Sequence, residues 1–315
     1  MTGILAAAGA LALLLLTAIF WVYHTAFYAP KKRPDIYQLP KGEQYERHRE
    51  QMLSLIRAME ALPFEQVTLT ARDGTQLEGR YYHLRDGAPL QIELHGYRGA
   101  GSRDFCGGNA LARSMGHNTL VVDQRAHGKS GGRTITFGIR EREDCLLWAE
   151  YAAERFGKDT PIFLSGVSMG AATVLMAAEL PLPNNVCGIV ADSPYSSPAA
   201  IVRKVCQDTG LPVRMAMALV RLGAWVPGGF SLTETDALRA VERTGIPILL
   251  IHGEDDRFVP CSMSREIYAR CAGPAFLETF PDAGHGLSYM EDPRRYERIV
   301  QAFTEYCLSK FKTQR

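Results

Sequence analysis

From residue 90 onward, short apolar runs alternate with longer stretches whose apolar residues recur every three or four positions. Short apolar runs bounded by turn residues are typical of buried strands, and the longer periodic stretches are typical of helices packed on a sheet. The predicted strands cover residues 90–94, 119–122, 161–164, 187–190, 246–251 and 275–280. The predicted helices cover residues 103–115, 140–156, 169–180, 262–271 and 293–311. This alternation predicts an α/β fold, with a mostly parallel, doubly wound sheet covered by helices on both faces.

A hairpin and a further helix precede this region. Residues 67–70 and 77–82 alternate apolar and polar side chains around Asp73-Gly74, a pair typical of hairpin turns. We therefore expect an antiparallel hairpin that leads into the sheet. Residues 42–62 carry apolar side chains that approximate one face of a helix, and we expect this helix to pack on the domain.

One interval breaks the alternation of strands and helices. Between Asp192 and Ile246 the chain is much longer than a single crossover helix requires. Turn residues divide this interval into helical pieces at residues 201–205, 213–222 and 237–241. We interpret the insertion, at about residues 193–243, as a helical lid. Its Met- and Leu-rich stretch, with Trp225 and Phe230, either packs the lid against the core, which we favour, or lines a pocket for an acyl or aromatic group.

The first part of the chain is apolar enough to enter a membrane. Residues 3–22 contain no charged side chain, and twenty helical residues span about 30 Å, the thickness of a bilayer core. A cleaved signal peptide is the alternative. We favour a retained single-pass anchor, because no Lys or Arg precedes the apolar run and no small-residue cleavage site precedes the aromatic stretch at 20–23. The predicted segments are an anchor at 1–29, a linker and juxtamembrane helix at 30–65, and one α/β domain at 66–315.

The flanking residues predict an orientation for this anchor. Aromatic residues at its end, Trp21 and Tyr23 among them, are expected at the level of the lipid headgroups, and Lys31-Lys32-Arg33 follow them. Basic residues favour the cytoplasmic side, so we predict that the α/β domain is cytoplasmic. The seven cysteines agree with this side, because they are scattered and lack metal-ligand spacing. A net charge of +1 gives no electrostatic case for a nucleic-acid partner.

The candidate chemistry begins at Gly166-Val167-Ser168-Met169-Gly170, which lies between a predicted strand and a predicted helix. A tight turn at this place strains the serine backbone, and the flanking glycines prevent a clash between the strand and the helix. The turn lifts the serine hydroxyl clear of the sheet, so we predict that Ser168 is a nucleophile. The alternative is a structural turn serine.

A serine nucleophile needs a base, and the base needs a group that fixes its tautomer. A loop rich in carboxylates, Glu254-Asp255-Asp256, follows the predicted strand at 246–251. His285, flanked by Gly284 and Gly286, follows the next strand. The candidate acid therefore lies between the serine and the histidine in the chain.

With these residues in place, the chain from about Val67 to its end resembles the α/β-hydrolase superfamily, in which this order of serine, acid and histidine is found. The family's H-G-x-x-D-x-x-V-P pattern matches residues 252–260, and the match implies that Asp256 is the orienting acid. Glu254 and Asp255 compete with it by proximity alone. Asp192, at the end of its strand, is a minor alternative, because some members carry the acid there.

Two further segments resemble loops of the same family. His95-Gly96-Tyr97-Arg98-Gly99 is similar to the H-G-x-x-G oxyanion loop, which implies that the backbone N–H groups of Tyr97 and Met169 form the oxyanion hole. In this reading His95 holds the loop by hydrogen bonds. Residues 123–132 are similar to the D-x-R-G-x-G-x-S turn, with departures at Ala126 and His127, and we expect this turn to brace the active-site loops.

The histidines form no H-E-x-x-H or comparable cluster, and no phosphate-binding glycine loop is joined to a lysine, so we expect an enzyme without cofactor or metal. The family resemblance adds a reaction class. It is strongest to membrane-anchored bacterial serine hydrolases, in an esterase or peptidase-like branch. We therefore expect a carboxylic ester hydrolase that uses Ser168, His285 and Asp256 through an acyl-enzyme, with a small-molecule acyl substrate of small to medium size that is derived from lipid. A serine peptidase or amidase, an acyltransferase and a non-catalytic membrane-tethered binding protein remain the alternatives. The fold alone does not choose among them.

Overall fold

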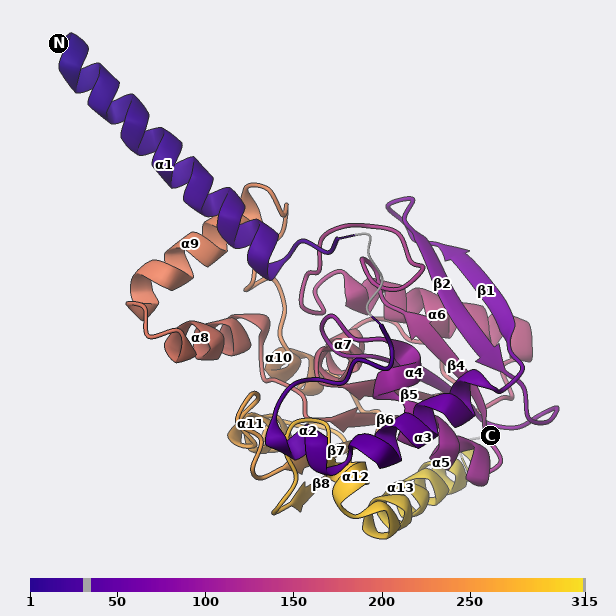
Figure 1. Ribbon diagram of the computed structural model, residues 1–315. Coiled ribbons are helices and arrows are strands. Elements are labelled where there is room, and N and C mark those ends of the chain that lie inside the picture. The colour runs from indigo at the N-terminus through magenta and orange to yellow at the C-terminus, as the bar shows by residue number, and fades with distance from the viewer. Residues whose placement is uncertain (31–34, 314–315) are drawn as a thin grey trace.

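The computed structural model describes residues 1–30 and 35–313, and within these residues one mixed sheet forms the centre of the molecule (Figure 1). The strand order is β1-β2-β4-β3-β5-β6-β7-β8. The strands are β1 (Glu65–Thr70), β2 (Gln76–Tyr82), β3 (Leu90–Leu94), β4 (Asn118–Asp123), β5 (Ile162–Val167), β6 (Val186–Asp192), β7 (Ile248–Gly253) and β8 (Ala275–Phe280). The β1–β2 and β2–β4 pairs are antiparallel, and all others are parallel. The predicted α/β fold with a mostly parallel, doubly wound sheet is confirmed.

The chain forms several helices within the described residues, and most of them cover the two faces of this sheet. They are α1 (Thr2–Ala26), α2 (Glu43–Arg47), α3 (Arg49–Glu60), α4 (Gly101–Asp104), α5 (Cys106–Ser114), α6 (Glu141–Phe156), α7 (Met169–Ala177), α8 (Pro198–Asp208), α9 (Val213–Trp225), α10 (Ala237–Val241), α11 (Ser262–Tyr268), α12 (Ser288–Glu291) and α13 (Pro293–Thr313). One apolar core joins α6, α7, α10 and α11 to the sheet. The cores on the other face contain side chains of α3, α5 and α13.

The central parallel strands are buried on both faces, as their sequences predict, whereas the edge strand β8 is mostly half-buried. Every residue of β3, β6 and β7 is buried, whereas β1 alternates and exposes most of one face. The carboxyl ends of the parallel strands therefore meet at one edge of a rigid sheet, where the loops after β3, β5, β7 and β8 come together. This edge carries the candidate site.

Two predicted helices are interrupted, and one short helix was not predicted. The stretch at 103–115 breaks at Phe105, and the stretch at 42–62 breaks at His48; both residues have non-helical backbone angles. The break at Phe105 lets α4 form a separate turn whose Asp104 reaches back to the loop after β3. The helix α12 is a single turn of four residues, too short for a periodic pattern to show.

The helix α1 projects away from the domain, and it is long and apolar enough to cross a membrane (Figure 1). Its last turns contact the domain. The hydroxyl groups of Tyr23 and Thr134 share a hydrogen bond of 2.7 Å. Just after the helix, Tyr28 forms an isolated antiparallel β-bridge with Thr134. The basic cluster Lys31-Lys32-Arg33, on which the predicted orientation depends, lies outside the described residues.

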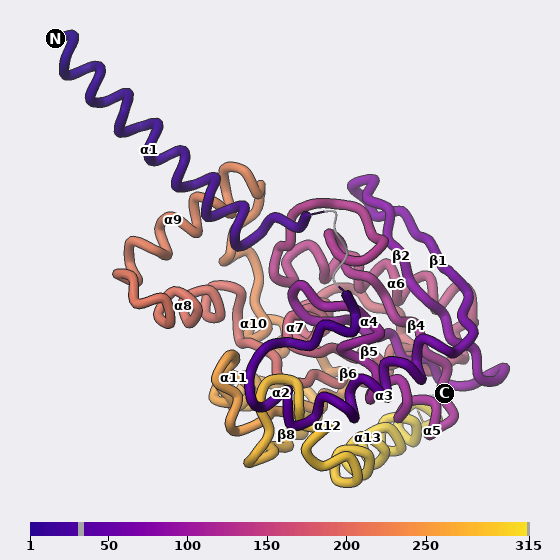
Figure 2. Tube along the Cα trace, in the orientation of Figure 1, coloured from indigo at the N-terminus to yellow at the C-terminus, as the bar shows by residue number. Residues whose placement is uncertain are grey.

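The insertion after β6 contains α8, α9 and α10, and α9 packs on the end of α1 (Figure 2). The favoured expectation that the insertion packs its aromatic residues on the core was wrong for Trp225, which is 68% exposed. Phe230 is buried, and its ring lies 5.2 Å from that of Phe27. The insertion therefore packs against α1, a partner that the spacing of its own residues does not reveal.

Candidate active site

Ser168 lies at the apex of the turn between β5 and α7, in a backbone conformation that side chains rarely adopt. Its φ is 56° and its ψ is −115°. A Cβ at Gly166 would overlap the backbone of Gly170, and a Cβ at Gly170 would overlap the carbonyl of Leu94 in the neighbouring strand. The Ser168 N–H donates to the Asp192 carbonyl at 2.8 Å, which fixes the turn to β6. Strain of this kind persists only where the surroundings impose it.

A continuous chain of hydrogen bonds joins Ser168, His285 and Asp256. His285 Nδ1 lies 2.7 Å from Asp256 Oδ2, and His285 Nε2 lies 2.8 Å from Ser168 Oγ. A carboxylate only accepts, so Nδ1 carries the proton and the free Nε2 accepts from the serine hydroxyl. The structure therefore brings together three residues that are far apart in the sequence, in the arrangement of a nucleophile, a base and an orienting acid.

Asp256 is held as a carboxylate by more than His285. Its Oδ1 accepts from the N–H groups of Phe258 at 2.9 Å and Val259 at 2.8 Å. Its Oδ2 also lies 3.3 Å from Nε2 of the buried His252. Burial opposes ionisation of this side chain, but the hydrogen bonds from His252 and His285 outweigh it and lower the pKa of Asp256. Asp256 is therefore charged at neutral pH and able to orient the imidazole.

The competing carboxylates bind elsewhere. Glu254 accepts from Arg265 at 3.1 Å and from Thr279 at 2.7 Å. Asp255 accepts from Gln44 at 2.6 Å. Neither of these two side chains has a hydrogen bond to His285 in the described part of the chain, so proximity in the sequence does not translate into contact.

Asp192 is buried under the same edge of the sheet but faces other partners. Its Oδ1 accepts from the Ser193 hydroxyl at 2.9 Å, and its Oδ2 accepts from the Tyr296 hydroxyl at 3.1 Å. Burial raises the pKa of Asp192. Its carboxyl group is thus engaged with hydroxyls beneath the site, while Asp256 contacts the imidazole.

The loop after β3 lies against the serine. A Cβ built on Gly96 would lie 3.4 Å from the Ser168 Cβ, and the Gly96 N–H donates to Asp104 at 2.9 Å. Among the described residues, the N–H groups of Tyr97 and Met169 donate to no side chain and to no loop carbonyl. Met169 is also the first residue of α7, and the N-terminus of a helix favours negative charge. These two N–H groups remain available to an anion at this place.

Two buried histidines hold this loop. His95 Nδ1 donates to the Gly96 carbonyl at 2.8 Å, and its Nε2 accepts from the Gln124 N–H at 3.1 Å. His127 Nε2 accepts from the Arg98 N–H at 2.9 Å. Burial lowers the pKa of His127 to about 4, so its ring is neutral and can accept. His95 thus binds within the loop as expected, and His127 is one of the two departures from the family turn.

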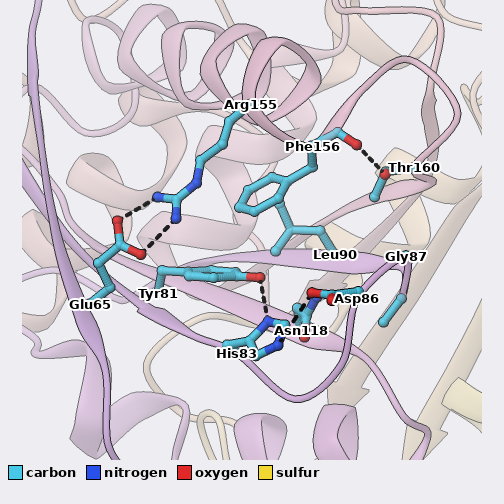
Figure 3. Close-up of a pocket in the computed structure, with 11 residues that line it drawn as sticks. Glu65, Tyr81, His83, Asp86, Gly87, Leu90, Asn118, Arg155, Phe156 and Thr160 are labelled. Atoms are coloured by element: carbon cyan, nitrogen blue, oxygen red, sulfur yellow. Dashed lines mark hydrogen bonds and ion pairs between the residues drawn. The ribbon is translucent and has the colours of Figure 1, made fainter.

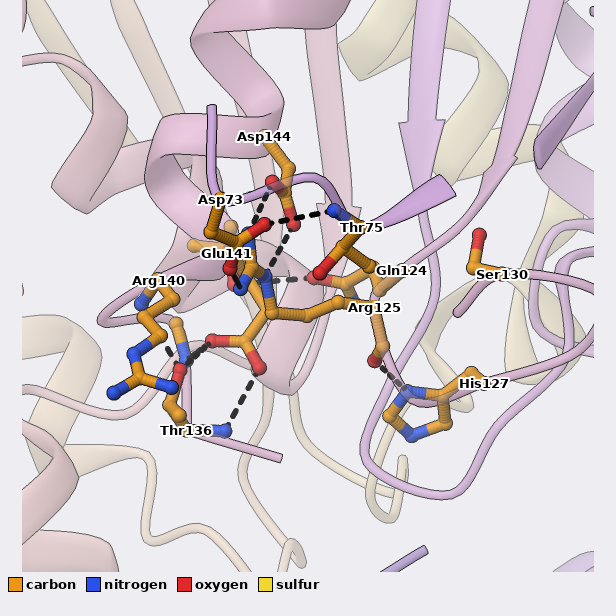
Figure 4. A network of polar contacts seen from close by, with 12 residues as sticks. Asp73, Thr75, Gln124, Arg125, His127, Ser130, Thr136, Arg140, Glu141 and Asp144 are labelled. Atoms are coloured by element: carbon orange, nitrogen blue, oxygen red, sulfur yellow. Dashed lines mark hydrogen bonds and ion pairs between the residues drawn. The ribbon is translucent and has the colours of Figure 1, made fainter. Parts of the chain in front are cut away.

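The turn at 123–132 is braced by a buried guanidinium. Arg125 donates to both carboxylate oxygens of Asp144 at 2.6 Å and to Asp73 at 2.8 Å (Figure 4). The carboxyl of Glu141 accepts from the Thr136 N–H at 2.8 Å in the same network. These contacts tie the turn to the β1–β2 hairpin and to α6, which is a structural role.

Several positioning residues carry no motif in the sequence. The Tyr45 hydroxyl in α2 donates to the His285 carbonyl at 2.9 Å, and Ser193, with φ 56°, accepts from the Gly286 N–H at 3.3 Å. His252 matches the family pattern, but only the structure shows its contact with Asp256. The position of Ser193 directly after a predicted strand could have marked it as a candidate. No sequence pattern pairs Tyr45 with residue 285.

A pocket of about 290 Å³ lies at the opposite edge of the sheet, where β3 and β4 begin (Figure 3). Tyr81, His83 and Arg155 line it, and Arg155 is paired with Glu65 at 2.6 Å. This pocket is separated from Ser168 by the length of the strands. Within residues 1–30 and 35–313, no group of three or more His, Cys, Asp or Glu side chains is arranged to hold a metal ion.

Residues 94–299 match the family model described as "Alpha/beta hydrolase family". An uncharacterised protein of Bacillus subtilis, YqkD, is 28% identical over 206 residues, which are 62% of this chain and 64% of the relative. The human protein ABHD12B is 29% identical over 204 residues, which are 59% of this chain and 50% of that protein. The matched region thus spans less than two thirds of the length of these two relatives.

Solved structures share the fold. The Pyrococcus furiosus esterase Pf2001 superposes with a TM-score of 0.64 at 20% identity, covering 89% of this chain and 98% of that one. Est1E from Butyrivibrio proteoclasticus, solved with ferulic acid bound, superposes with a TM-score of 0.58 at 20% identity, covering 77% and 99%. At these identities the likeness is one of fold.

Proposed function

Because the chain belongs to the alpha/beta hydrolase family, we propose that it is a serine hydrolase that cleaves carboxylic esters. The observation that carries the proposal is the pair of hydrogen bonds, 2.8 Å and 2.7 Å, that joins strained Ser168 through His285 to Asp256. In this assignment Ser168 is the nucleophile, His285 is the general base and then the general acid, and Asp256 orients the imidazole.

The chemistry follows from this geometry. As Ser168 Oγ attacks the ester carbonyl carbon, its proton moves to His285 Nε2 and the carbonyl oxygen becomes an oxyanion. The N–H groups of Tyr97 and Met169 donate to that oxyanion, and loss of one such donor typically costs 10²- to 10³-fold in rate. The tetrahedral intermediate collapses when the C–O bond to the alcohol breaks and His285 returns the proton to the leaving oxygen. Water, deprotonated by His285, then attacks the acyl carbon. The bond between that carbon and Ser168 Oγ breaks, His285 returns the proton to Oγ, and the carboxylic acid is released.

The ester class is supported by the proteins that share the fold. Pf2001 carries the name esterase, and Est1E was solved with ferulic acid. Neither likeness specifies the acyl group of this chain. We expect a small to medium acyl ester.

The position of α1 supports a lipid-derived substrate. Its last residues hydrogen-bond directly to the loop beside Ser168, through Tyr97 and Arg98. If α1 spans a bilayer as a single anchor, the site lies close to the membrane surface, where lipid-derived esters are concentrated. A cytoplasmic domain remains our prediction for the orientation.

The test compares esters with amides on the full chain. We expect hydrolysis of p-nitrophenyl esters with a preference among short, medium and long acyl chains, and none after Ser168→Ala. Matched p-nitroanilides should be cleaved far more slowly, because an amine is a poorer leaving group. Faster cleavage of the anilides would favour a peptidase or amidase, and preferential transfer to an added alcohol would favour an acyltransferase. No turnover of any of them would favour a binding protein.

A further inference from the structure

The helix α9 carries an apolar stripe that is exposed along most of its length and only partly covered at Leu222. The stripe begins just before the helix and repeats every three or four positions, which places its members on one face. We call this set the α9 face, and it consists of Leu211, Met215, Ala218, Leu222 and Trp225. Leu211 is 57% exposed, Met215 61% and Trp225 68%. Large exposed apolar side chains in one row are unusual on a surface that faces only water.

The opposite face of α9 is also apolar, but it is buried. Met217, Val220 and Ala224 pack into a cluster with the end of α1 and with α8. The helix contains no acidic residue, and its charged residues, Arg214 and Arg221, are both exposed and seven positions apart. An ordinary surface helix presents a polar face to water. Both the buried face of α9 and its outward face are instead apolar.

The position at which α9 contacts α1 indicates what covers the α9 face. At Gly223 the two helices approach so closely that a Cβ would lie 3.3 Å from the Ile19 carbonyl and from the Tyr23 N–H nitrogen. The part of α1 before this contact, residues 2–17, is exposed and extends about 24 Å at ~1.5 Å per residue. This length is close to the thickness of a bilayer core, so α9 meets α1 at the level where an inserted α1 leaves the hydrocarbon.

The orientation of α9 relative to α1 also agrees with a position at the membrane surface. In Figure 1, α9 meets the base of α1 at its carboxyl end and leads away to one side, across the direction of α1. A helix that crosses a transmembrane helix at its base lies along the membrane surface. Trp225 is of the residue type favoured at the membrane–water interface, and exposed arginines beside an apolar stripe suit anionic headgroups.

We propose that the α9 face is a membrane-interface surface, seated in the headgroup region of the bilayer that α1 spans. This inference rests on the proposed anchoring by α1. The lipid bilayer is the chosen occupant because the α9 face continues directly from a helix that is itself suited to lipid. Two contacts, α1 and α9, fix the tilt of the domain and hold the edge that carries Ser168 towards the membrane surface.

Tryptophan quenching tests the proposal on the full chain. The tryptophans are Trp21 on α1, Trp225 on the α9 face and Trp148, which is buried in the core. The protein is reconstituted into vesicles of phosphatidylcholine and phosphatidylglycerol that contain phosphatidylcholine brominated on its acyl chains near the headgroup. Trp21→Phe leaves Trp225 as the surface reporter, and Trp225→Phe leaves Trp21. The double variant gives the baseline from Trp148.

The outcomes separate the anchor from the α9 face. Quenching of Trp225 to an extent comparable with Trp21, and well above the Trp148 baseline, is expected. Quenching of Trp21 without Trp225 would overturn the inference and leave the anchor in place. Quenching of neither would overturn the anchor and the inference together. If Trp225 is unquenched but becomes shielded as protein concentration rises, the face is covered by a second copy, which also contradicts the proposal.

A second pair of variants tests the role of the basic residues. Arg214→Gln combined with Arg221→Gln should reduce the dependence of Trp225 quenching on phosphatidylglycerol while Trp21 quenching is unchanged. The matched control is Arg239→Gln, a substitution on α10. Equal dependence on the anionic lipid in all three proteins would contradict a headgroup contact by α9.

Discussion

The Tyr97 hydroxyl donates a hydrogen bond of 2.7 Å to the carbonyl oxygen of Ala26, the last residue of α1. The neighbouring Arg98 donates to the Thr25 carbonyl at 2.8 Å. The last carbonyls of a helix have no partner within it, so the loop beside Ser168 satisfies the end of α1. The loop that offers the candidate oxyanion donor is thus bonded directly to the candidate membrane helix.

Tyr97→Phe should separate this contact from the chemistry. The variant keeps the backbone N–H and the stacking of its ring on Phe137, and it loses one hydrogen bond, worth about 1 kcal/mol. We expect ester hydrolysis to fall by less than about tenfold, since ~1.4 kcal/mol corresponds to a factor of ten. Steady-state kinetics in vesicles measure this. A loss as complete as that of Ser168→Ala would mean that the phenol itself takes part in the reaction.

Asp256→Asn should reduce kcat by about 10⁴-fold, because an amide fixes the wrong tautomer of a base while leaving its position intact. Asp255→Asn is the matched control on the adjacent residue, which binds Gln44 and should keep nearly full activity. Asp192→Asn tests the alternative acid. The assignment is wrong if Asp192→Asn abolishes turnover in a folded protein and Asp256→Asn does not.

Acid should destabilise the domain through its buried histidines. Burial lowers the pKa of His117 to about 4, from 6.5 in the unfolded chain. Between these pH values the unfolded state binds more protons, so stability is full above pH 6.5 and falls as pH decreases towards 4. His117→Gln should reduce this slope by up to about 1.4 kcal/mol per pH unit. Denaturant unfolding at a series of pH values measures it, and an unchanged slope would show that His117 does not contribute.

Gly170→Ala should be strongly destabilising, because the added Cβ meets the Leu94 carbonyl at the crossing of α7 and β3. Overpacking against backbone costs about 3 kcal/mol or more. Gly245→Ala is the control, since no atom lies within 4 Å of a Cβ there. Its effect should stay within about 0.5 kcal/mol. Thermal unfolding of both variants measures this difference. Similar melting temperatures would contradict the close approach of the Gly170 backbone to the Leu94 carbonyl.

The fold class and the three residues of the hydrogen-bond chain were predictable because their signals are local. Parallel strands that are buried on both faces appear in the sequence as apolar runs. The glycines on either side of Ser168 are needed because a Cβ at these positions would overlap neighbouring backbone atoms. Asp256 was distinguishable from its neighbours only through the resemblance to the family pattern.

Contacts between distant segments were not predictable. Nothing in the spacing of α2 indicates that Tyr45 reaches the His285 carbonyl, and nothing in α9 indicates that Gly223 faces Ile19 of α1. The apolar residues on α9 predict that the helix is covered on more than one side, but they do not identify the covering segment. The sequence therefore predicts a core or pocket position for Trp225, whereas the structure exposes its side chain.

Labelling with a fluorophosphonate probe tests the central claim most directly, because the probe reacts with an activated serine whatever the substrate. We predict that the folded full chain is labelled, that Ser168→Ala is not, and that His285→Ala, which keeps the hydroxyl but removes its base, is labelled far more slowly. Labelling of Ser168→Ala at the rate of the parent, or no labelling of the folded parent, would contradict the account.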